Sequence, residues 1–183
     1  MIILIGGNSS VGKTYMAQTL LEKYNMPYLS IDHLKMGLYR SGRDFGFTPM
    51  DSIEVISGKL WPILKGIIMT NIENNQHLIM EGCYILPQNV REFEKEYAKK
   101  IIPAWIGFSP KYLNERFETI VKYRNVIEVR GDRPDPSVLS AYDFKTKCSE
   151  YRFPYFEITE DYEQQIQAVY RYIDERKKTM ENG

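Results

Sequence analysis

Cysteine and histidine are scarce in this 183-residue sequence. The only cysteines are Cys83 and Cys148. They form no Cys-x-x-Cys pair, and two cysteines are too few for the disulfide framework of a small secreted domain. The histidines, His33 and His77, are too few and too far apart in the chain for a zinc site. We therefore expect two reduced thiols in a cytoplasmic protein.

An excess of charge of one sign is also lacking, because 24 Lys and Arg residues balance 24 Asp and Glu residues. Extended nucleic-acid binding usually requires a basic domain, so the balance argues against it while leaving room for a local basic patch. No apolar stretch approaches the roughly 20 residues of a membrane span, and no charged leader precedes the first apolar run. We expect one domain over 1–183, as a monomer or a homodimer.

The most informative segment follows the apolar run at 1–5 and fits the phosphate-loop pattern of glycine, four residues, then Gly-Lys-Thr. Its members are Gly7, Asn8, Ser9, Ser10, Val11, Gly12, Lys13 and Thr14. The glycines allow a tight backbone whose N–H groups can surround phosphate oxygens. Lys13 would reach the β- and γ-phosphates, and the Thr14 hydroxyl would bind Mg²⁺. The pattern predicts a site for ATP with Mg²⁺.

Strand and helix signals alternate along the rest of the chain. The predicted strands are 1–6, 27–31, 78–81, 101–108 and 155–158. The predicted helices are 13–24, 34–40, 51–74, 90–100, 111–122, 138–150 and 162–178, with Pro62 expected to kink or divide the third of them. This order predicts an α/β chain with a three-layer P-loop NTPase fold, in which helices flank a five-stranded parallel sheet.

Two carboxylates follow predicted strands at the edge of the sheet where ligands collect. Glu81 ends the third strand, where an acidic residue can help to hold Mg²⁺, although an ordinary strand-end glutamate is the alternative. Asp32 follows the second strand and could orient an acceptor hydroxyl and take its proton. The alternative for Asp32 is an N-cap of the next helix, and the two roles are compatible. Either carboxylate could be the base.

Basic residues form two groups. Lys35, Arg40 and Arg43 lie in an acceptor-binding region at about 33–75, where they would suit an anionic substrate or form a solvated helix face. The second group belongs to a predicted lid at about 116–136, whose arginines would neutralise the transferred phosphate and exclude water. Arg116 and Arg124 are the leading candidates, whereas Arg130 and Arg133 could equally be surface residues.

With these motifs, the chain resembles the small P-loop kinases that act on nucleoside monophosphates, shikimate and gluconate. The segment 29–35 resembles that group's Asp-x-Leu-Arg segment, which assigns Asp32 and Lys35 to acceptor binding. Glu81-Gly82 resembles the strand that ends in an acid and a glycine, and Arg116 matches the arginine that begins the lid. The full length also resembles bacterial proteins described as 2-phosphoglycerate kinase or adenylate kinase.

The sequence departs from the adenylate kinases in two places. Cys83-Tyr84-Ile85 stands where they have Phe-Pro-Arg, and Lys35 replaces an arginine that would bind phosphate with two hydrogen bonds. The leading hypothesis is therefore an ATP- and Mg²⁺-dependent kinase acting on a small anionic metabolite. The alternatives are a nucleoside monophosphate kinase and a regulatory module that binds nucleotide without transferring phosphate.

Overall fold

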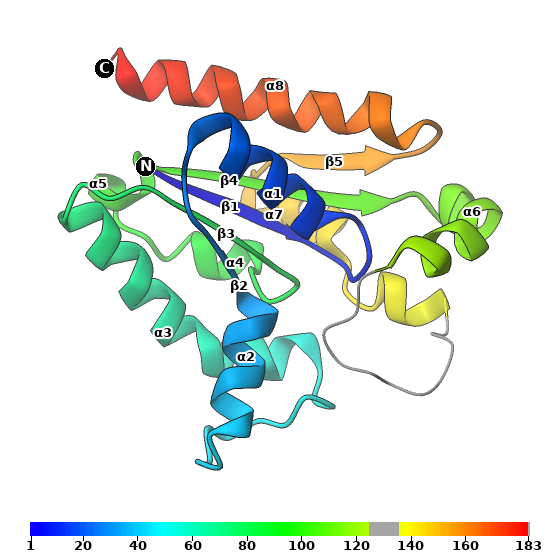
Figure 1. The fold of residues 1–183 in the computed structure, drawn as a ribbon, viewed down its shortest axis with the longest axis horizontal. Helices are drawn as coiled ribbons and strands as arrows, with labels where there is room; N and C mark the ends of the chain where they lie inside the picture. The colour runs from blue at the N-terminus through cyan, green and yellow to red at the C-terminus, as the bar shows by residue number, and fades with distance from the viewer. Residues whose placement is uncertain (125–135, 183) are drawn as a thin grey trace.

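The computed structural model describes residues 1–124 and 136–182. At its centre is a parallel five-stranded sheet in the order β2-β3-β1-β4-β5 (Figure 1). The strands are β1 (Ile2–Gly7), β2 (Tyr28–Ser30), β3 (Leu78–Gly82), β4 (Ile101–Phe108) and β5 (Tyr155–Ile158). β1 is the central strand, and its Ile2 aligns with Leu78 of β3 and Ile101 of β4. The carboxyl ends of these strands therefore meet where the phosphate-loop motif begins.

Helices cover both faces of the sheet (Figure 1). The helices are α1 (Lys13–Tyr24), α2 (Ile31–Arg40), α3 (Ile53–Glu73), α4 (Pro87–Val90), α5 (Lys95–Ala98), α6 (Pro110–Tyr123), α7 (Phe144–Tyr151) and α8 (Tyr162–Glu181), with a 3₁₀ turn, η1, at Pro136–Ser140. α1 and α8 pack on one face, and α3, α4 and α7 pack on the other. The predicted three-layer α/β fold with a five-stranded parallel sheet is confirmed.

The alternation of side chains along β1 divides the interior into two cores. Ile3 and Ile5 face α1 and α8, whereas Ile2 and Leu4 face α3 and α7. All four side chains are at most 1% exposed. Complete burial of each such side chain contributes about 1.5–3 kcal/mol, so the first strand is fixed from both sides before any polar contact is considered.

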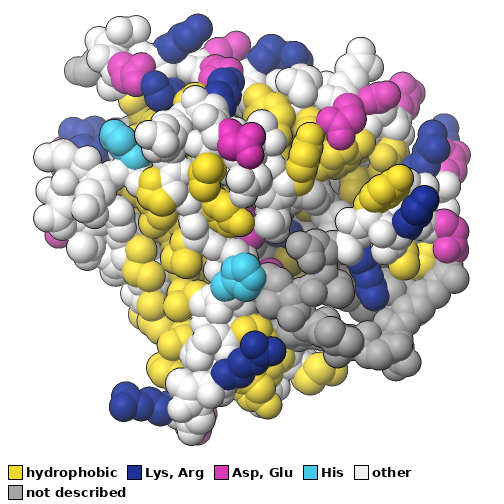
Figure 2. All heavy atoms as spheres, viewed as in Figure 1, with side chains coloured by type: hydrophobic (Ala, Val, Ile, Leu, Met, Phe, Trp, Pro, Cys, Tyr) yellow, Lys and Arg dark blue, Asp and Glu magenta, His cyan; other side chains and the backbone are white. Residues whose placement is uncertain are grey.

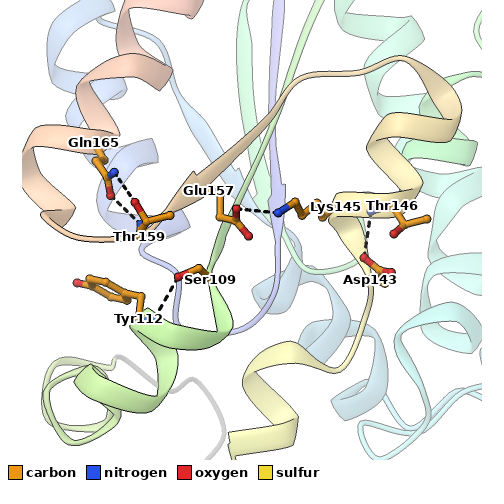
Figure 3. A network of polar contacts seen from close by, with 8 residues as sticks. All are labelled: Ser109, Tyr112, Asp143, Lys145, Thr146, Glu157, Thr159 and Gln165. Carbon is orange, nitrogen blue, oxygen red and sulfur yellow. Dashed lines mark hydrogen bonds and ion pairs between the residues drawn. The ribbon is translucent and has the colours of Figure 1, made fainter.

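Short polar contacts fix the starts of the helices near the carboxyl ends of β4 and β5 (Figure 3). Ser109 caps α6 by accepting a hydrogen bond from the Tyr112 amide at 3.1 Å, and Asp143 caps α7. After β5, the Gln165 side chain accepts from the Thr159 amide at 2.8 Å. The N-caps Ser109 and Asp143 set where α6 and α7 begin, and such caps typically contribute about 1 kcal/mol each.

Both signs of charge are scattered over the face of the molecule shown in Figure 2, between hydrophobic side chains. This distribution matches the balance of acidic and basic residues in the sequence. Within the described ranges, no helix combines the length and the apolar composition needed to cross a bilayer.

The single surface helix predicted for 90–100 is wrong. The structure has two short helices, α4 and α5, separated by a turn. Val90 and Phe93 are both buried, and Phe93 packs edge-on against Trp61 with ring centroids 5.7 Å apart. This packing bends the chain toward the core, which a continuous charged helix would not allow.

Two further predicted helices, 138–150 and 34–40, differ from the structure. The helix predicted for 138–150 is interrupted, because η1 ends at Ser140 and α7 begins only after Asp143. α2 begins at Ile31, three residues earlier than expected, and its N-cap is Ser30 rather than Asp32. Asp32 therefore lies in the first turn of α2, where its negative charge still suits the helix dipole.

Pro62 does not divide the long helix α3, which is continuous from Ile53 to Glu73. A proline inside a helix costs about 3 kcal/mol, because it removes a hydrogen bond and crowds the preceding turn. The buried stripe that includes Leu60, Leu64 and Ile68 extends on both sides of Pro62 and packs into the same core. Burial of this stripe offsets the local penalty and keeps one helix.

We predict opposite effects of alanine at two glycines. A Cβ at Gly6 would lie 2.2 Å from Nε1 of Trp105, so Gly6→Ala should lower the free energy of unfolding by at least about 2 kcal/mol. Gly66 lies in α3, and a Cβ added there would meet nothing within 4 Å. Because alanine favours the helix more than glycine does, Gly66→Ala should raise the free energy of unfolding by about 0.5–1 kcal/mol. Urea denaturation of both variants measures the difference. Equal stability of the two variants would contradict the assigned packing of β1 on Trp105.

Candidate active site

The loop after β1 forms a tight concave turn. Gly7, Ser10 and Gly12 have φ angles of 141°, 62° and 85°, respectively. A Cβ at Gly7 would lie 2.1 Å from the carbonyl oxygen of Ile106, and a Cβ at Gly12 would lie 1.7 Å from the Tyr162 hydroxyl. These positions require glycine both for backbone conformation and for space. Successive amides in such turns form the nests that bind anions.

The Asn8 side chain links the loop to a distant segment. Its amide nitrogen donates to the Tyr142 carbonyl at 2.9 Å, and its amide oxygen accepts from the Tyr142 N–H at 3.1 Å. The Asn8 side chain thus pairs with both the N–H and the carbonyl of Tyr142, a buried residue 134 positions away in the chain. The same contact explains the break between η1 and α7, because the Tyr142 backbone is engaged by the loop rather than by a helix.

Lys13 is buried at the start of α1 and points back over the loop. Its ammonium donates to the Asn8 carbonyl at 2.7 Å and contacts the Cys83 sulfur at 3.3 Å. Burial by itself would lower the pKa of Lys13, but the neighbouring Cys83, Glu81 and Asp32 outweigh it and raise that pKa. Burial also raises the pKa of the Cys83 thiol, despite the adjacent ammonium. A charged lysine beside a neutral thiol is therefore in place over the loop.

Thr14 and Glu81 come together although 67 residues separate them. The Thr14 hydroxyl donates to Oε1 of Glu81 at 3.2 Å, and Glu81 is 1% exposed. Ser30 aligns with Glu81 on the neighbouring strand, so both side chains lie on the same face of the sheet. In the part of the chain that the structure describes, the buried Ser30 hydroxyl has no hydrogen-bond partner.

This group of oxygens fits Mg²⁺. Hydroxyl and carboxylate oxygens are the ligands that the ion prefers, and Mg²⁺ usually takes only one or two protein carboxylates together with phosphates and water. Residues 1–124 and 136–182 contain no cluster of three or more His, Cys, Asp or Glu side chains placed to hold a metal. Both the Thr14–Glu81 pair and the lack of a larger cluster fit a Mg²⁺ site whose remaining ligands come from a bound nucleotide and water.

Asp32 and Lys35 lie one helical turn apart at the start of α2. Nζ of Lys35 is 3.5 Å from Oδ1 of Asp32 and donates to the Tyr84 hydroxyl at 3.0 Å. Lys35 is 2% exposed, whereas 29% of the Asp32 side chain is exposed. Burial and the nearby Asp32 raise the pKa of Tyr84 to about 12, so its hydroxyl is neutral at physiological pH. The carboxylate is the most exposed group of this trio.

Not every residue predicted for the acceptor side joins this group. Arg40, the last residue of α2, and Arg43, beyond its end, are both exposed, as in the alternative of a solvated helix face. A Cβ at Gly82 would lie 2.9 Å from Cβ of Ile31, so the absence of a side chain at Gly82 lets α2 approach β3 closely. Gly82 thereby contributes to the position of Asp32.

The predicted lid is described only in part. Arg116 is exposed on α6, and Arg124 is the half-buried residue that ends the same helix. α6 starts at the carboxyl end of β4, on the side of the sheet that carries the phosphate loop (Figure 1). Arg130 and Arg133 lie outside the described residues. The structure thus places two of the four predicted arginines on one helix.

Sequence reasoning missed the residues that hold the loop in place. Tyr142 and Tyr162 come from distant elements, and the Tyr162 hydroxyl donates to the Val11 carbonyl at 3.2 Å. Cys83 and Tyr84 were noted only as departures from a familiar pattern, although they contact the two buried lysines. Their position directly after Glu81-Gly82, at the edge where ligands collect, is the one sequence signal that could have drawn attention to them.

The comparisons with known proteins bear on this arrangement. No protein-family model matches the sequence, and no curated protein matches it. Solved structures do match. A putative kinase from Chloroflexus aurantiacus superposes with a TM-score of 0.57 at 18% identity, covering 95% of this chain and 96% of the other. The fold is that of the small P-loop kinases.

Two further structures support the same conclusion about the fold. Shikimate kinase from Aquifex aeolicus has a TM-score of 0.54 at 14% identity and covers 95% of this chain and 96% of its own. A gluconokinase from Sinorhizobium meliloti has a TM-score of 0.51 at 16% identity, and the match covers 98% of this chain and 93% of the gluconokinase. The similarity extends over the whole chain, as the resemblance to shikimate and gluconate kinases predicts. The narrower resemblance to 2-phosphoglycerate kinase or adenylate kinase stays a prediction.

We predict that the Asn8 contact stabilises the whole fold. Asn8→Ala leaves the buried N–H of Tyr142 without its partner and removes one of the two hydrogen bonds to the Tyr142 carbonyl, which should lower the free energy of unfolding by about 1–3 kcal/mol. The control is Asn74→Ala, which removes an exposed hydrogen bond within one helix terminus and should cost less than about 0.5 kcal/mol. Urea denaturation measures both. A loss for Asn8→Ala no larger than for the control would contradict the role of this contact.

Proposed function

We propose that the protein is a P-loop kinase that transfers the γ-phosphate of ATP to a small, anionic metabolite. The observation that carries the proposal is the meeting of Lys13, Thr14, Glu81, Asp32 and Lys35 at the carboxyl ends of β1, β2 and β3. Binding of a nucleotide alone requires the loop but no carboxylate on the acceptor side, which is why Asp32 favours transfer over a regulatory module.

The phosphate loop would bind the polyphosphate of ATP. We assign the backbone of Gly7, Ser9, Ser10 and Val11 to the phosphate cradle, and Lys13 to the β- and γ-phosphates. In this assignment, Lys13 exchanges its present hydrogen bond to the Asn8 carbonyl for phosphate oxygens. Gly12 begins α1, whose N-terminal dipole favours the same anion.

Thr14 and Glu81 would hold Mg²⁺, and Ser30 supplies a further hydroxyl beside them. When bound, the ion would neutralise negative charge on the transferred phosphate. Thr14 and Glu81 would not need to move far, because the Thr14 hydroxyl oxygen and Oε1 of Glu81 are already 3.2 Å apart. Arg116 and Arg124, in the proposed lid at 116–136, would add positive charge from the opposite side and exclude water.

On the acceptor side, at about 33–75, we assign Asp32 to the reacting hydroxyl and Lys35 to an anionic group of the acceptor. The acceptor oxygen attacks the γ-phosphorus, the bond from that phosphorus to the oxygen of ADP breaks, and the proton of the hydroxyl passes to the Asp32 carboxylate. Lys35 is held by Tyr84, which keeps its ammonium fixed beside Asp32. Arg40 and Arg43 would act only on an acceptor that extends along α2.

An assay across chemical classes of acceptor identifies the substrate. We expect ADP formation with a hydroxylated carboxylic acid, such as shikimate or gluconate, or with a phosphorylated one, such as 2-phosphoglycerate. A coupled assay of ADP release with each acceptor in turn makes the measurement. Turnover with AMP alone would establish the nucleoside monophosphate kinase instead. Binding of ATP with no turnover on any acceptor would favour the regulatory module.

We predict that Asp32→Asn separates transfer from binding. The amide keeps the shape of the side chain but accepts a proton poorly, so acceptor-dependent turnover should fall by about 10²- to 10⁴-fold, while the affinity for Mg²⁺-ATP, measured by calorimetry, stays within about twofold. The matched control is Asp174→Asn on α8, a carboxylate paired with Lys23 and remote from the loop, which should leave both values unchanged. Unaltered turnover in Asp32→Asn would show that Asp32 is not the base.

A further inference from the structure

A cavity lies at the end of the sheet opposite the phosphate loop. It has a volume of about 640 Å³ and is formed by the α4–α5 segment, the start of β4, the α7–β5 connection and the second half of α8. The eight residues of β4 separate the two ends of the sheet by about 23 Å, at about 3.3 Å per residue. The cavity is therefore separate from the candidate active site, and its size is that of a small-molecule site.

The charge around this cavity has one sign. Arg91, Lys95, Arg152 and Arg176 line it, and none of the twelve lining residues is Asp or Glu. Over the described ranges, none of these four side chains lies within 4.0 Å of a carboxylate, whereas eight lysines elsewhere in the chain do. In a chain with no net charge, four cations that line one cavity with no carboxylate in its lining favour an anionic ligand there.

The rest of the cavity is apolar and aromatic. Phe93, Phe153 and Tyr172 line it between the cations. The Arg91 guanidinium lies 6.0 Å from the centre of the Phe153 ring, which keeps that cation over an aromatic face. A ligand held here would place a flat apolar part against the rings and a charged part among the guanidinium groups.

The backbone at Arg152 is an independent indication. Arg152 ends α7 with a φ angle of 58°, a left-handed conformation in which glycine or asparagine is usual. Among the described residues, only Ser10 and Arg152 combine a positive φ with a side chain other than asparagine. Ser10 belongs to the phosphate loop. A left-handed arginine is uncommon, and such a backbone outlier points to a role for the side chain that occupies it.

We propose that this cavity binds a small organic phosphate that contains a planar ring. The guanidinium groups of Arg91, Arg152 and Arg176 would hold the phosphate by charge-assisted hydrogen bonds, for which the fork of donors on arginine is well suited. Phe153 and Tyr172 would contact the ring. The proposal does not depend on the kinase activity, because its residues are distinct from those of the candidate active site.

The test is a fluorescence titration with 1-naphthyl phosphate, a planar aromatic phosphate. We expect saturable binding with one site per chain, and binding of the uncharged 1-naphthol at least about tenfold weaker, because the phosphate is the group that the arginines hold. Inorganic pyrophosphate should compete. No saturation below about 5 mM, which corresponds to a binding free energy near −3 kcal/mol, would overturn the proposal.

Matched variants locate the binding. Arg176→Glu should weaken it at least about tenfold, whereas Arg171→Glu, the same change on the same helix but outside the cavity, should leave it within about twofold. Arg152→Gly should also weaken binding at least about tenfold without lowering the melting temperature, because glycine accepts the left-handed conformation. Equal losses in Arg171→Glu and Arg176→Glu, or full binding in Arg152→Gly, would show that the ligand is held elsewhere or by general charge alone.

Discussion

The close approach of the β1–α1 turn to the elements around it is the constraint on which the rest of the structure depends. Gly6 packs against Trp105, Gly7 against the Ile106 carbonyl and Gly12 against the Tyr162 hydroxyl. Each contact leaves no room for a Cβ, so packing from three sides constrains the shape of the turn. Because the turn is fixed, Lys13 and Thr14 start α1 at a defined place beside Glu81.

Electrostatic balance is the second principle of the candidate site. Two buried lysines, Lys13 and Lys35, face Glu81 and Asp32, and burial of unpaired charge would be costly. The two carboxylates therefore offset the burial of the two ammonium groups even without a ligand. An incoming polyphosphate would add negative charge to this set, which is consistent with the proposed role of a divalent cation and of arginines supplied from α6.

The sequence predicted the fold class and the loop because both depend on local patterns. Apolar runs ending in glycine or an acid identify the strands, and the spacing of Gly7, Gly12 and Lys13 is specific. Other features depend on distant contacts. The interruption before α7 follows from the Asn8 contact with Tyr142, and the continuity of α3 through Pro62 follows from its burial. Nothing local distinguished the buried Lys35 from the exposed Arg40 and Arg43 either.

The long-range contacts of the phosphate loop have a consequence for biosynthesis. The motif at 7–14 leaves the ribosome well before Tyr142 and Tyr162, which form part of its surroundings. A nascent chain that ends before these tyrosines contains every residue of the motif and still lacks the contacts that shape it. A segment that is synthesised early therefore gains its full set of contacts only after Tyr162 has been added to the chain.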